Sequence, residues 1–351
     1  MPVTLEQVIS LAVELRCSDI HISVGLPIAF RINGQLQTAP FNVTVEESEI
    51  MIRQMLHLVS KEELESITDL DFAFSLGEQR HRANIYKQQG RATATIHLIN
   101  RRIPSFESLG LPNILRTFAE EPRGLILITG PTGSGKSTTL AAMIEWLNNN
   151  HSYHILTIED PIEYIFKSQK CLIHQREVGK DVPSFATALR AALREDPDVM
   201  MVGEMRDFET ISAAVTAAET GQLVLGTLHT IGAAQTIERV IGAFPPSAQA
   251  QIRTQLAGVL KGIVTQQLIP RQDTNNRIVA TEVLVVNEGV AHMIRENKIH
   301  QLDSQMQSGA AVGMHTLNGD LARLVREGII SRDAAFEATT NKKDLVQYLG
   351  L

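Results

Sequence analysis

Residues 125–137 read Leu-Ile-Leu-Ile-Thr-Gly-Pro-Thr-Gly-Ser-Gly-Lys-Ser. The last eight, residues 130–137, match the pattern G-x-x-x-x-G-K-[ST], in which main-chain N–H groups wrap the phosphates of a nucleoside triphosphate. The apolar run before the loop is typical of a buried parallel strand, and apolar residues recur at helical spacing in 138–147. The pattern requires this order of strand, loop and helix, so we predict a triphosphate-binding P-loop.

Each residue type in this loop has a physical role. Glycines allow positive φ angles and bring N–H groups close to phosphate oxygens, and the N-terminus of the following helix adds partial positive charge. We expect the Lys136 ammonium to reach the β and γ phosphates and the Ser137 hydroxyl to ligate Mg²⁺. The residues predicted to bind the nucleotide are Thr132, Gly133, Ser134, Gly135, Lys136, Ser137 and Thr138.

The composition is that of an ordinary globular protein. The chain has 351 residues, room for about two domains, and 44% of them are hydrophobic and 20% charged. A net charge of −7 argues against general nucleic-acid binding, which normally needs a basic surface. No apolar run approaches the roughly 18–20 residues that span a bilayer, and the N-terminus lacks a signal-like segment, so we expect a cytoplasmic protein without membrane insertion.

The first part of the chain, residues 1–99, is predicted to be a small α+β domain. Helical patterns cover 4–15 and 46–65, and β-rich segments cover 19–23, 28–32 and 91–99. Asn33-Gly34 favours a tight hairpin turn. Residues 100–113 mix Pro, Gly and polar residues, as expected of a linker between two cores.

The second part, residues 114–351, is predicted to be an α/β domain that ends in a helical segment at about 287–351. Strand-like runs alternate with helical ones, which implies a mainly parallel sheet covered by helices on both faces. Ligands of such sheets lie beyond the carboxyl ends of the strands, where the P-loop falls. The expected strands are 125–129, 154–159, 198–202 and 223–228, and the expected helices lie near 137–148, 185–195, 208–219 and 233–242.

Hydrolysis of a bound triphosphate needs a group that polarises the attacking water. The apolar run 199–203 leads directly into Glu204, which we predict for this role. The alternative is a solvated acid at the end of a strand. Many P-loop enzymes carry an Asp at the position that is Gly203 here, so metal support is expected to come from elsewhere.

An acidic cluster follows the strand predicted at 154–159. Glu159, Asp160 and Glu163 lie within five residues of one another, and such close like charges favour a counterion. We predict that Glu159 and Glu163 support Mg²⁺ together with Ser137. The alternative is a group of surface acids before a turn at Pro161.

A histidine ends another predicted strand. His229 follows the run 223–228, and from there it could hydrogen-bond the γ-phosphate and report its loss to the rest of the domain. Taken without its position, it would be interpreted as a structural histidine.

Together, four motifs resemble the secretion ATPase superfamily. They are the P-loop, Glu-Asp-Pro-Ile-Glu at 159–163, Val-Gly-Glu-Met-Arg-Asp at 202–207 and Gly-Thr-Leu-His-Thr at 226–230. Within the superfamily the chain resembles the twitching-motility, or retraction, ATPases of type IV pili, because Met-Gln-Ser-Gly at 306–309 and Gly-Met-His-Thr-Leu at 313–317 follow the catalytic domain. Extension and secretion ATPases usually carry a longer N-terminal region and a four-cysteine metal element, and this sequence has neither.

The resemblance implies a hexameric ring with a PAS-like N-terminal domain and a RecA-like C-terminal domain, with ATP bound between them. It also implies a partner, the inner-membrane platform protein of the pilus machinery, where domain motion removes pilin from the fibre base. Glu204 takes the role of catalytic glutamate, Glu163 that of metal-side acid, and His229 that of the histidine box. The expected preference for ATP over GTP rests on this resemblance.

The family also directs arginines of the N-terminal domain to the phosphates. Arg-His-Arg-Ala-Asn at 80–84 keeps the first such pattern, so Arg82 is the candidate finger, with a surface charge as the alternative. His97 stands where a second arginine is usual, and a histidine is only partly protonated at neutral pH. Arg91, Arg101 or Arg102 could replace that second arginine.

A second departure lies at 289–296, where only the Ile-Arg-Glu end of a retraction motif survives. A packing helix with Val290, Met293 and Ile294 on one face is the alternative interpretation. A divergent paralogue that modulates pilus dynamics therefore stays open beside a retraction motor. A RecA-like nucleic-acid translocase and a regulatory module that binds nucleotide without hydrolysis are the remaining alternatives, opposed by the acidic composition and by Glu204 respectively.

Overall fold

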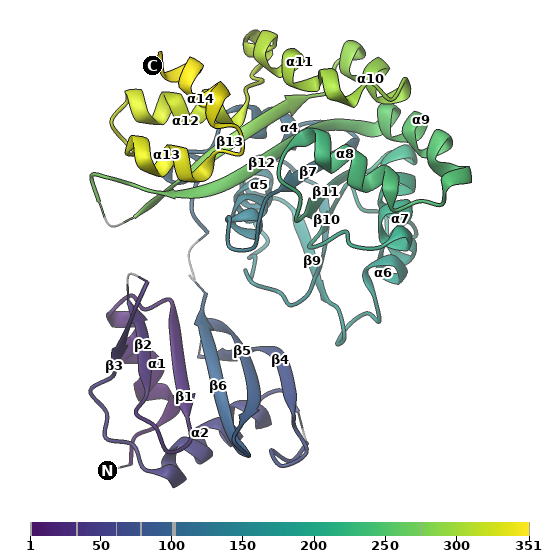
Figure 1. The fold of residues 1–351 in the computed structure, drawn as a ribbon. Coiled ribbons are helices and arrows are strands. Elements are labelled where there is room, and N and C mark those ends of the chain that lie inside the picture. Colours follow the sequence, from purple (N-terminus) through teal and green to yellow (C-terminus); the bar gives the residue numbers. More distant parts are fainter. Residues whose placement is uncertain are drawn as a thin grey trace. The chain divides into compact units, whose positions relative to one another are not determined.

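The computed structural model describes residues 2–32, 34–60, 62–77, 79–99, 103–274 and 276–350. The chain forms two compact units (Figure 1). Unit 1 comprises Met1–Arg102 with Pro161–Ile165, and unit 2 comprises Ile103–Asp160 with Phe166–Leu351. No helix in the described part of the chain is both long and apolar enough to cross a membrane.

Unit 1 is an antiparallel sheet with two helices. The sheet has the order β3-β2-β1-β6-β5-β4, and both helices contact β1. Each helix begins with a capping box, at Thr4 and at Thr44, which satisfies main-chain N–H groups of the first turn. The elements are α1 (Leu5–Glu14), β1 (Asp19–Ser23), β2 (Ala29–Ile32), β3 (Gln35–Thr38), α2 (Val45–His57), β4 (Asp69–Leu76), β5 (Gln79–Gln88) and β6 (Arg91–Leu98).

Two details of unit 1 can be compared with the sequence-based expectations. The second helix ends at His57, so the prediction of helix through residue 65 was too long; a turn occupies 64–66 instead. Strands β2 and β3 form a hairpin in which Ile32 pairs with Gln35, and Gly34 has a φ of +83°. Asn33, the other residue predicted for this turn, lies outside the described residues.

Unit 2 is built on a seven-stranded sheet of order β13-β12-β7-β11-β10-β8-β9. Neighbouring strands are parallel except β12 and β13, so the predicted mainly parallel sheet is confirmed. The strands are β7 (Gly124–Thr129), β8 (His154–Glu159), β9 (Leu172–Glu177), β10 (Val199–Val202), β11 (Leu223–Leu228), β12 (Leu260–Pro270) and β13 (Arg277–Val285).

The helices of unit 2 cover the sheet and its C-terminal extension. They are α3 (Phe106–Leu109), α4 (Ile114–Ala119), α5 (Lys136–Asn150), α6 (Phe185–Ala192), α7 (Phe208–Glu219), α8 (Ala233–Gly242), α9 (Gln249–Val259), α10 (Glu288–Arg295), α11 (Leu302–Ser308), α12 (Leu317–Arg326), α13 (Arg332–Ala338) and α14 (Lys342–Leu349), with short 3₁₀ turns at Pro246–Ala248, Ile299–Gln301 and Ala310–Val312. Helix α3 falls within the segment predicted as a linker, of which residues 100–102 lie outside the described ones.

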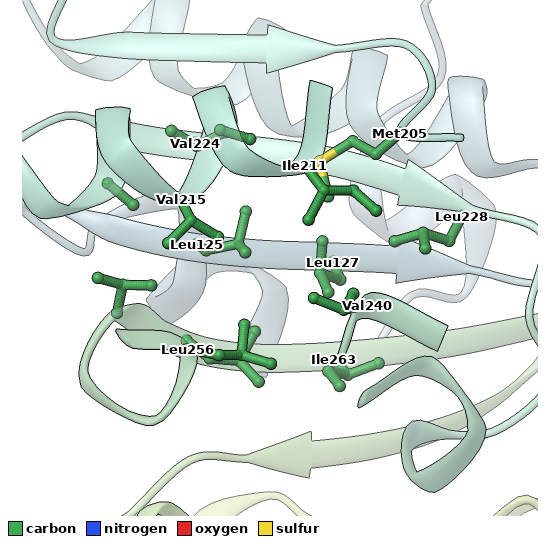
Figure 2. Close-up of a cluster of buried hydrophobic side chains, with 14 of the residues drawn as sticks. Leu125, Leu127, Met205, Ile211, Val215, Val224, Leu228, Val240, Leu256 and Ile263 are labelled. Atoms are coloured by element: carbon green, nitrogen blue, oxygen red, sulfur yellow. The ribbon is translucent and has the colours of Figure 1, made fainter. Parts of the chain in front are cut away.

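The central strands of unit 2 are buried in its core. All residues of β7 and β11 are buried, and both α5 and α7 contact β7. Strands buried on both faces need a continuous apolar sequence, which is what residues 125–128 supply. Figure 2 shows this cluster, with side chains of β7, β11 and β12 packed among those of α7, α8 and α9.

A second, smaller core lies between the hairpin β12–β13 and the C-terminal helices. Ile269 and Ala280 of the hairpin pack with Leu321 and Leu345, which come from α12 and α14. Of the helical segment expected from about residue 287, helices α12, α13 and α14 are thus seated on this hairpin, whereas α10 and α11 pack into the main core of unit 2. Strand β12 of the hairpin also runs beside the P-loop strand β7.

Candidate functional site

The strand order of unit 2 brings the predicted motifs to one edge of the sheet. In the register of the parallel strands, Thr129 pairs with Leu228, Gly226 with Val202, and Val202 with Ile158. The residues that follow these strands are therefore neighbours at their carboxyl ends: the P-loop after β7, His229 after β11, Glu204 after β10, and Glu159 as the last residue of β8. This is the edge at which ligands of such sheets bind.

The P-loop has the backbone that its glycines allow. Gly130, Gly133 and Gly135 have φ angles of +139°, +76° and +90°, which L side chains rarely adopt. A Cβ added to Gly133 would meet nothing within 4 Å, so the space beside this residue is open. Gly135 is the N-cap of α5, and the helix N-terminus supplies the partial positive charge that phosphates need.

Lys136 is held inside the loop. Its Nζ donates to the carbonyl oxygens of Gly130 and Pro131, at 2.9 Å each, and the residue is 9% exposed. These carbonyls are acceptors that hold the ammonium at the loop. Thr132 and Ser137 are exposed, and Thr138 is half-buried, so the residues predicted to bind nucleotide all lie along this one turn and the start of α5.

Glu204 and His229 are in contact. Nε2 of His229 lies 2.9 Å from Oε1 of Glu204, and Nε of Arg206 contacts the same oxygen. The Glu204 side chain is 19% exposed, compared with 41% for His229. The main chain on either side of Glu204 is fixed, because the N–H of Gly203 donates to Ile158 in β8 and that of Met205 donates to Thr227 in β11.

Steric hindrance explains the glycine at position 203, where many P-loop enzymes carry an aspartate. A Cβ at this position would lie 3.2 Å from the main-chain oxygen of Ile158 and 3.4 Å from Cα of Glu159. The approach of β10 to the end of β8 therefore leaves little room for a side chain. The close spacing of the two strands therefore accounts for a glycine, and not an acid, at residue 203.

Glu159 is a buried and oriented carboxylate. It is 7% exposed, and its Oε1 accepts hydrogen bonds from the Thr157 hydroxyl at 2.7 Å and from Nε2 of Gln175 at 3.1 Å. Within the described residues no group of three or more His, Cys, Asp and Glu side chains could hold a metal ion. Glu159 is thus not part of a carboxylate cage within the described residues.

Three of the predicted residues belong to unit 1. Glu163 lies in the segment Pro161–Ile165 of that unit. Nη2 of Arg82, in β5, lies 3.6 Å from Oδ2 of Asp71. Arg82 also pairs in register with His97 of β6. Nδ1 of His97 contacts Asp19, so the histidine that replaces the usual arginine is engaged within its own sheet. Arg101 and Arg102 lie outside the described residues.

Two polar residues at this edge, one half-buried and one buried, were not predicted to have a role. Oε1 of Glu282, in β13, accepts a hydrogen bond of 2.7 Å from the N–H of Ala233 and so fixes the start of α8, four residues after His229. Burial raises the pKa of this carboxyl. Gln266, in β12, is hydrogen-bonded to the P-loop itself. Gln266 lies between Thr265 and Gln267, and Glu282 follows Thr281, so the sequence alone singles out neither position.

Comparison with known proteins agrees with these motifs. A profile of the type II/IV secretion system protein family matches residues 1–343. The chain belongs to this family. It is 42% identical over 336 residues to the type IV pilus retractation ATPase PilT of Pseudomonas aeruginosa, covering 95% of this chain and 97% of that protein. It is 43% identical over 339 residues to a twitching motility protein of Neisseria gonorrhoeae, covering 94% of this chain and 91% of the relative.

Solved structures give the same result. The crystal structure of the pilus retraction motor PilT with bound ADP matches with a TM-score of 0.90 at 44% identity and covers 98% of this chain and 99% of that one. The predicted superfamily, the α/β fold with a RecA-like P-loop domain, and the assignment as an ATP hydrolase are confirmed by the family and by these relatives. The roles of individual site residues stay predictions.

Proposed function

We propose that this chain is an ATP-driven motor of type IV pilus retraction, which removes pilin from the fibre base as it hydrolyses ATP. The observation that carries the proposal is the contact between Glu204 and His229 at the sheet edge where the P-loop begins. Similarity along nearly the whole chain to PilT and to a twitching motility protein supports the pilus as the object of the motor.

The chemistry assigned to Glu204 is polarisation of the attacking water. Its Oε1 is engaged by His229 and Arg206, whereas among the described residues no contact to Oε2 is seen. Oε2 is therefore the oxygen that can accept a hydrogen bond from water. Because His229 touches Glu204 and follows the strand next to β7, loss of the γ-phosphate can be sensed by the residue pair and passed to the loop before α8.

The loop fits a nucleotide and a magnesium ion. There is open space beside Gly133 for a ligand. The buried Lys136 ammonium is the group that holds phosphates, and the exposed Ser137 hydroxyl at the first turn of α5 is the group that holds a hydrated cation. Bound Mg²⁺ supplies neutralising charge on the phosphate oxygens. We assign Ser137, Glu159 and Glu163 to the support of this ion.

Arg82 is the proposed positive charge on the transferred phosphoryl group. Its ionic contact to Asp71, at 3.6 Å, joins two exposed side chains and is therefore weak. His97 is a poor substitute for the second arginine of the family because it contacts Asp19. We therefore assign the finger role to Arg82 rather than to His97, and Arg91, Arg101 and Arg102 stay open as replacements for the second arginine.

The assembly is also part of the proposal. We assign a homohexamer, located peripherally on the cytoplasmic side of the inner membrane and docked on the pilus platform protein.

A divergent paralogue that modulates pilus dynamics is the second candidate, because of the altered segment 289–296. Helix α10 buries Val290, Ala291 and Ile294, and Met293 is partly buried against the same core. The packing face thus contains the three predicted residues and also Ala291.

Two experiments test this function. Cells that lack the protein are expected to accumulate surface pili, and a normal number of pili would contradict the retraction role. ATP turnover of the purified protein is then measured with and without single-stranded DNA, beside a Glu204→Gln variant. Stimulation by DNA would favour a translocase, and equal rates for variant and parent would remove Glu204 from the reaction.

A further inference from the structure

Gln266 connects three elements at the P-loop. It lies in β12, next to Thr265, which pairs in register with Thr129 at the end of β7. The residue is 1% exposed. Its Nε2 donates to the main-chain oxygen of Ser134 at 2.7 Å, and its Oε1 accepts from the Thr139 hydroxyl, in the first turn of α5, at 2.9 Å.

The orientation of this amide is set by its partners. The carbonyl of Ser134 can only accept, so the amide nitrogen has to face it, and the amide oxygen is then left for the Thr139 hydroxyl. Both hydrogen bonds are buried, where an unmade bond is costly. Gln266 is therefore fixed as a clamp between β12, the loop and α5.

Fixing the Ser134 carbonyl also fixes an N–H group. The carbonyl of Ser134 and the N–H of Gly135 belong to one planar trans peptide and point in opposite directions. Since the carbonyl points to Gln266 in β12, the N–H of Gly135 points to the other side of the loop, away from β12. Main-chain N–H groups on that side are the ones that cradle phosphates in a loop of this pattern.

Glycines of the loop lie tightly against the same residue. A Cβ at Gly130 would lie 2.3 Å from the main-chain oxygen of Gln266, and one at Gly135 would lie 3.2 Å from its Nε2. The loop has no side chain at the two points where Gln266 meets it, so the contact is close at both ends of the loop.

We infer that Gln266 is a positioning residue that presets the P-loop for phosphate before nucleotide arrives. It acts through Ser134 and does not itself touch the nucleotide. The inference rests on the ATPase function proposed above and deepens it, because it names the group that keeps an N–H of the loop aimed at the phosphate.

The test compares Gln266→Met with Thr139→Val in the full-length protein. Gln266→Met is close in size to the parent and loses the donor to Ser134, whereas Thr139→Val removes only the second hydrogen bond and is the matched control. Affinity for ADP is measured by calorimetric titration, and kcat and KM for ATP by phosphate release. Gln266→Met is expected to weaken ADP binding by about tenfold, the equivalent of one buried hydrogen bond, and to raise KM more than it lowers kcat. Thr139→Val is expected to keep ADP affinity within about twofold.

Gln266→Glu provides a second variant in case the methionine variant does not fold. Its carboxylate keeps the acceptor for Thr139 and loses the donor, so it is expected to weaken ADP binding by at least as much. Parent-like ADP affinity in a folded Gln266 variant, or an equal loss in Thr139→Val, would overturn the inference and leave the ATPase assignment intact. A parent protein that neither binds ADP nor hydrolyses ATP would overturn the function, and this inference with it.

Discussion

Acidification is expected to destabilise unit 1, and the contribution of one residue, His81, can be isolated by a single substitution. This side chain of β5 is fully buried beside Phe74, with ring centroids 5.2 Å apart, and neither ring nitrogen has a hydrogen-bond partner within the described residues. Burial lowers the pKa of His81 from 6.5 to about 4. The folded protein therefore keeps the ring neutral at pH values where the unfolded chain binds a proton.

The sign and size of the effect follow from proton linkage. Well above pH 6.5 the ring is neutral in the folded and the unfolded state, so its titration does not change the free energy of unfolding. Between pH 6.5 and about 4 only the unfolded chain is protonated, so the free energy of unfolding falls as the pH falls, and below about 4 the loss levels off. The full loss is about 3 kcal/mol, and about 2 kcal/mol of it is reached between pH 7 and pH 5.

Hydrogen exchange read by mass spectrometry on peptides of β5 measures this loss, after correction for the intrinsic pH dependence of exchange. About 2 kcal/mol corresponds to an increase of about 30-fold in the open population of unit 1. His81→Phe is the control, because it keeps an aromatic ring and cannot titrate. Trp146 lies in α5 of unit 2, so its fluorescence reports whether that unit stays folded. An equal pH dependence in parent and His81→Phe would refute the argument.

Three further changes test the site and the core. Lys136→Ala is expected to weaken ATP binding on the order of 100-fold, the worth of one strong charge-assisted contact, and an unchanged affinity in a titration would exclude the phosphate role. Arg82→Ala is expected to spare nucleotide binding and to lower kcat on the order of a thousandfold, as for other arginine fingers; parent-like turnover would remove Arg82 from the site. Gly262→Ala would place a Cβ 2.1 Å from the ring of Phe118 and is expected to destabilise unit 2 by about 2–3 kcal/mol in denaturant unfolding. Gly258→Ala, with nothing within 4 Å of its Cβ, is the control and is expected to cost nothing.

The sequence was most informative where apolar runs are continuous. Strands β8 and β11 and helices α7 and α8 have the predicted bounds. The two strands are recognisable because β11 is buried throughout and β8 is buried from Ile155 onward. Strand β9 was not predicted. Its sequence, Leu-Ile-His-Gln-Arg-Glu, is mostly polar and only Glu177 is buried, as expected of a strand at the edge of the sheet.

The site could be predicted only as a set of strand ends. That Glu204, His229 and the P-loop follow strands was visible in the sequence, but the order β7-β11-β10-β8 that makes them neighbours depends on pairing between distant segments. The role of Gln266 escaped prediction for the same reason, since it is 132 residues from Ser134 in the chain. Local patterns carry no information about such long-range contacts.

The narrow spacing at Gly203 has a consequence for protein engineering. An aspartate introduced here, to copy enzymes that hold their metal with one, would push against the backbone of Ile158 and Glu159. The replacement would alter the position of the Glu159 carboxylate at the same time as it added a new acid. A change in metal requirement after such a swap could therefore not be credited to the new aspartate alone, and a redesign of this edge has to begin with the distance between the two strands.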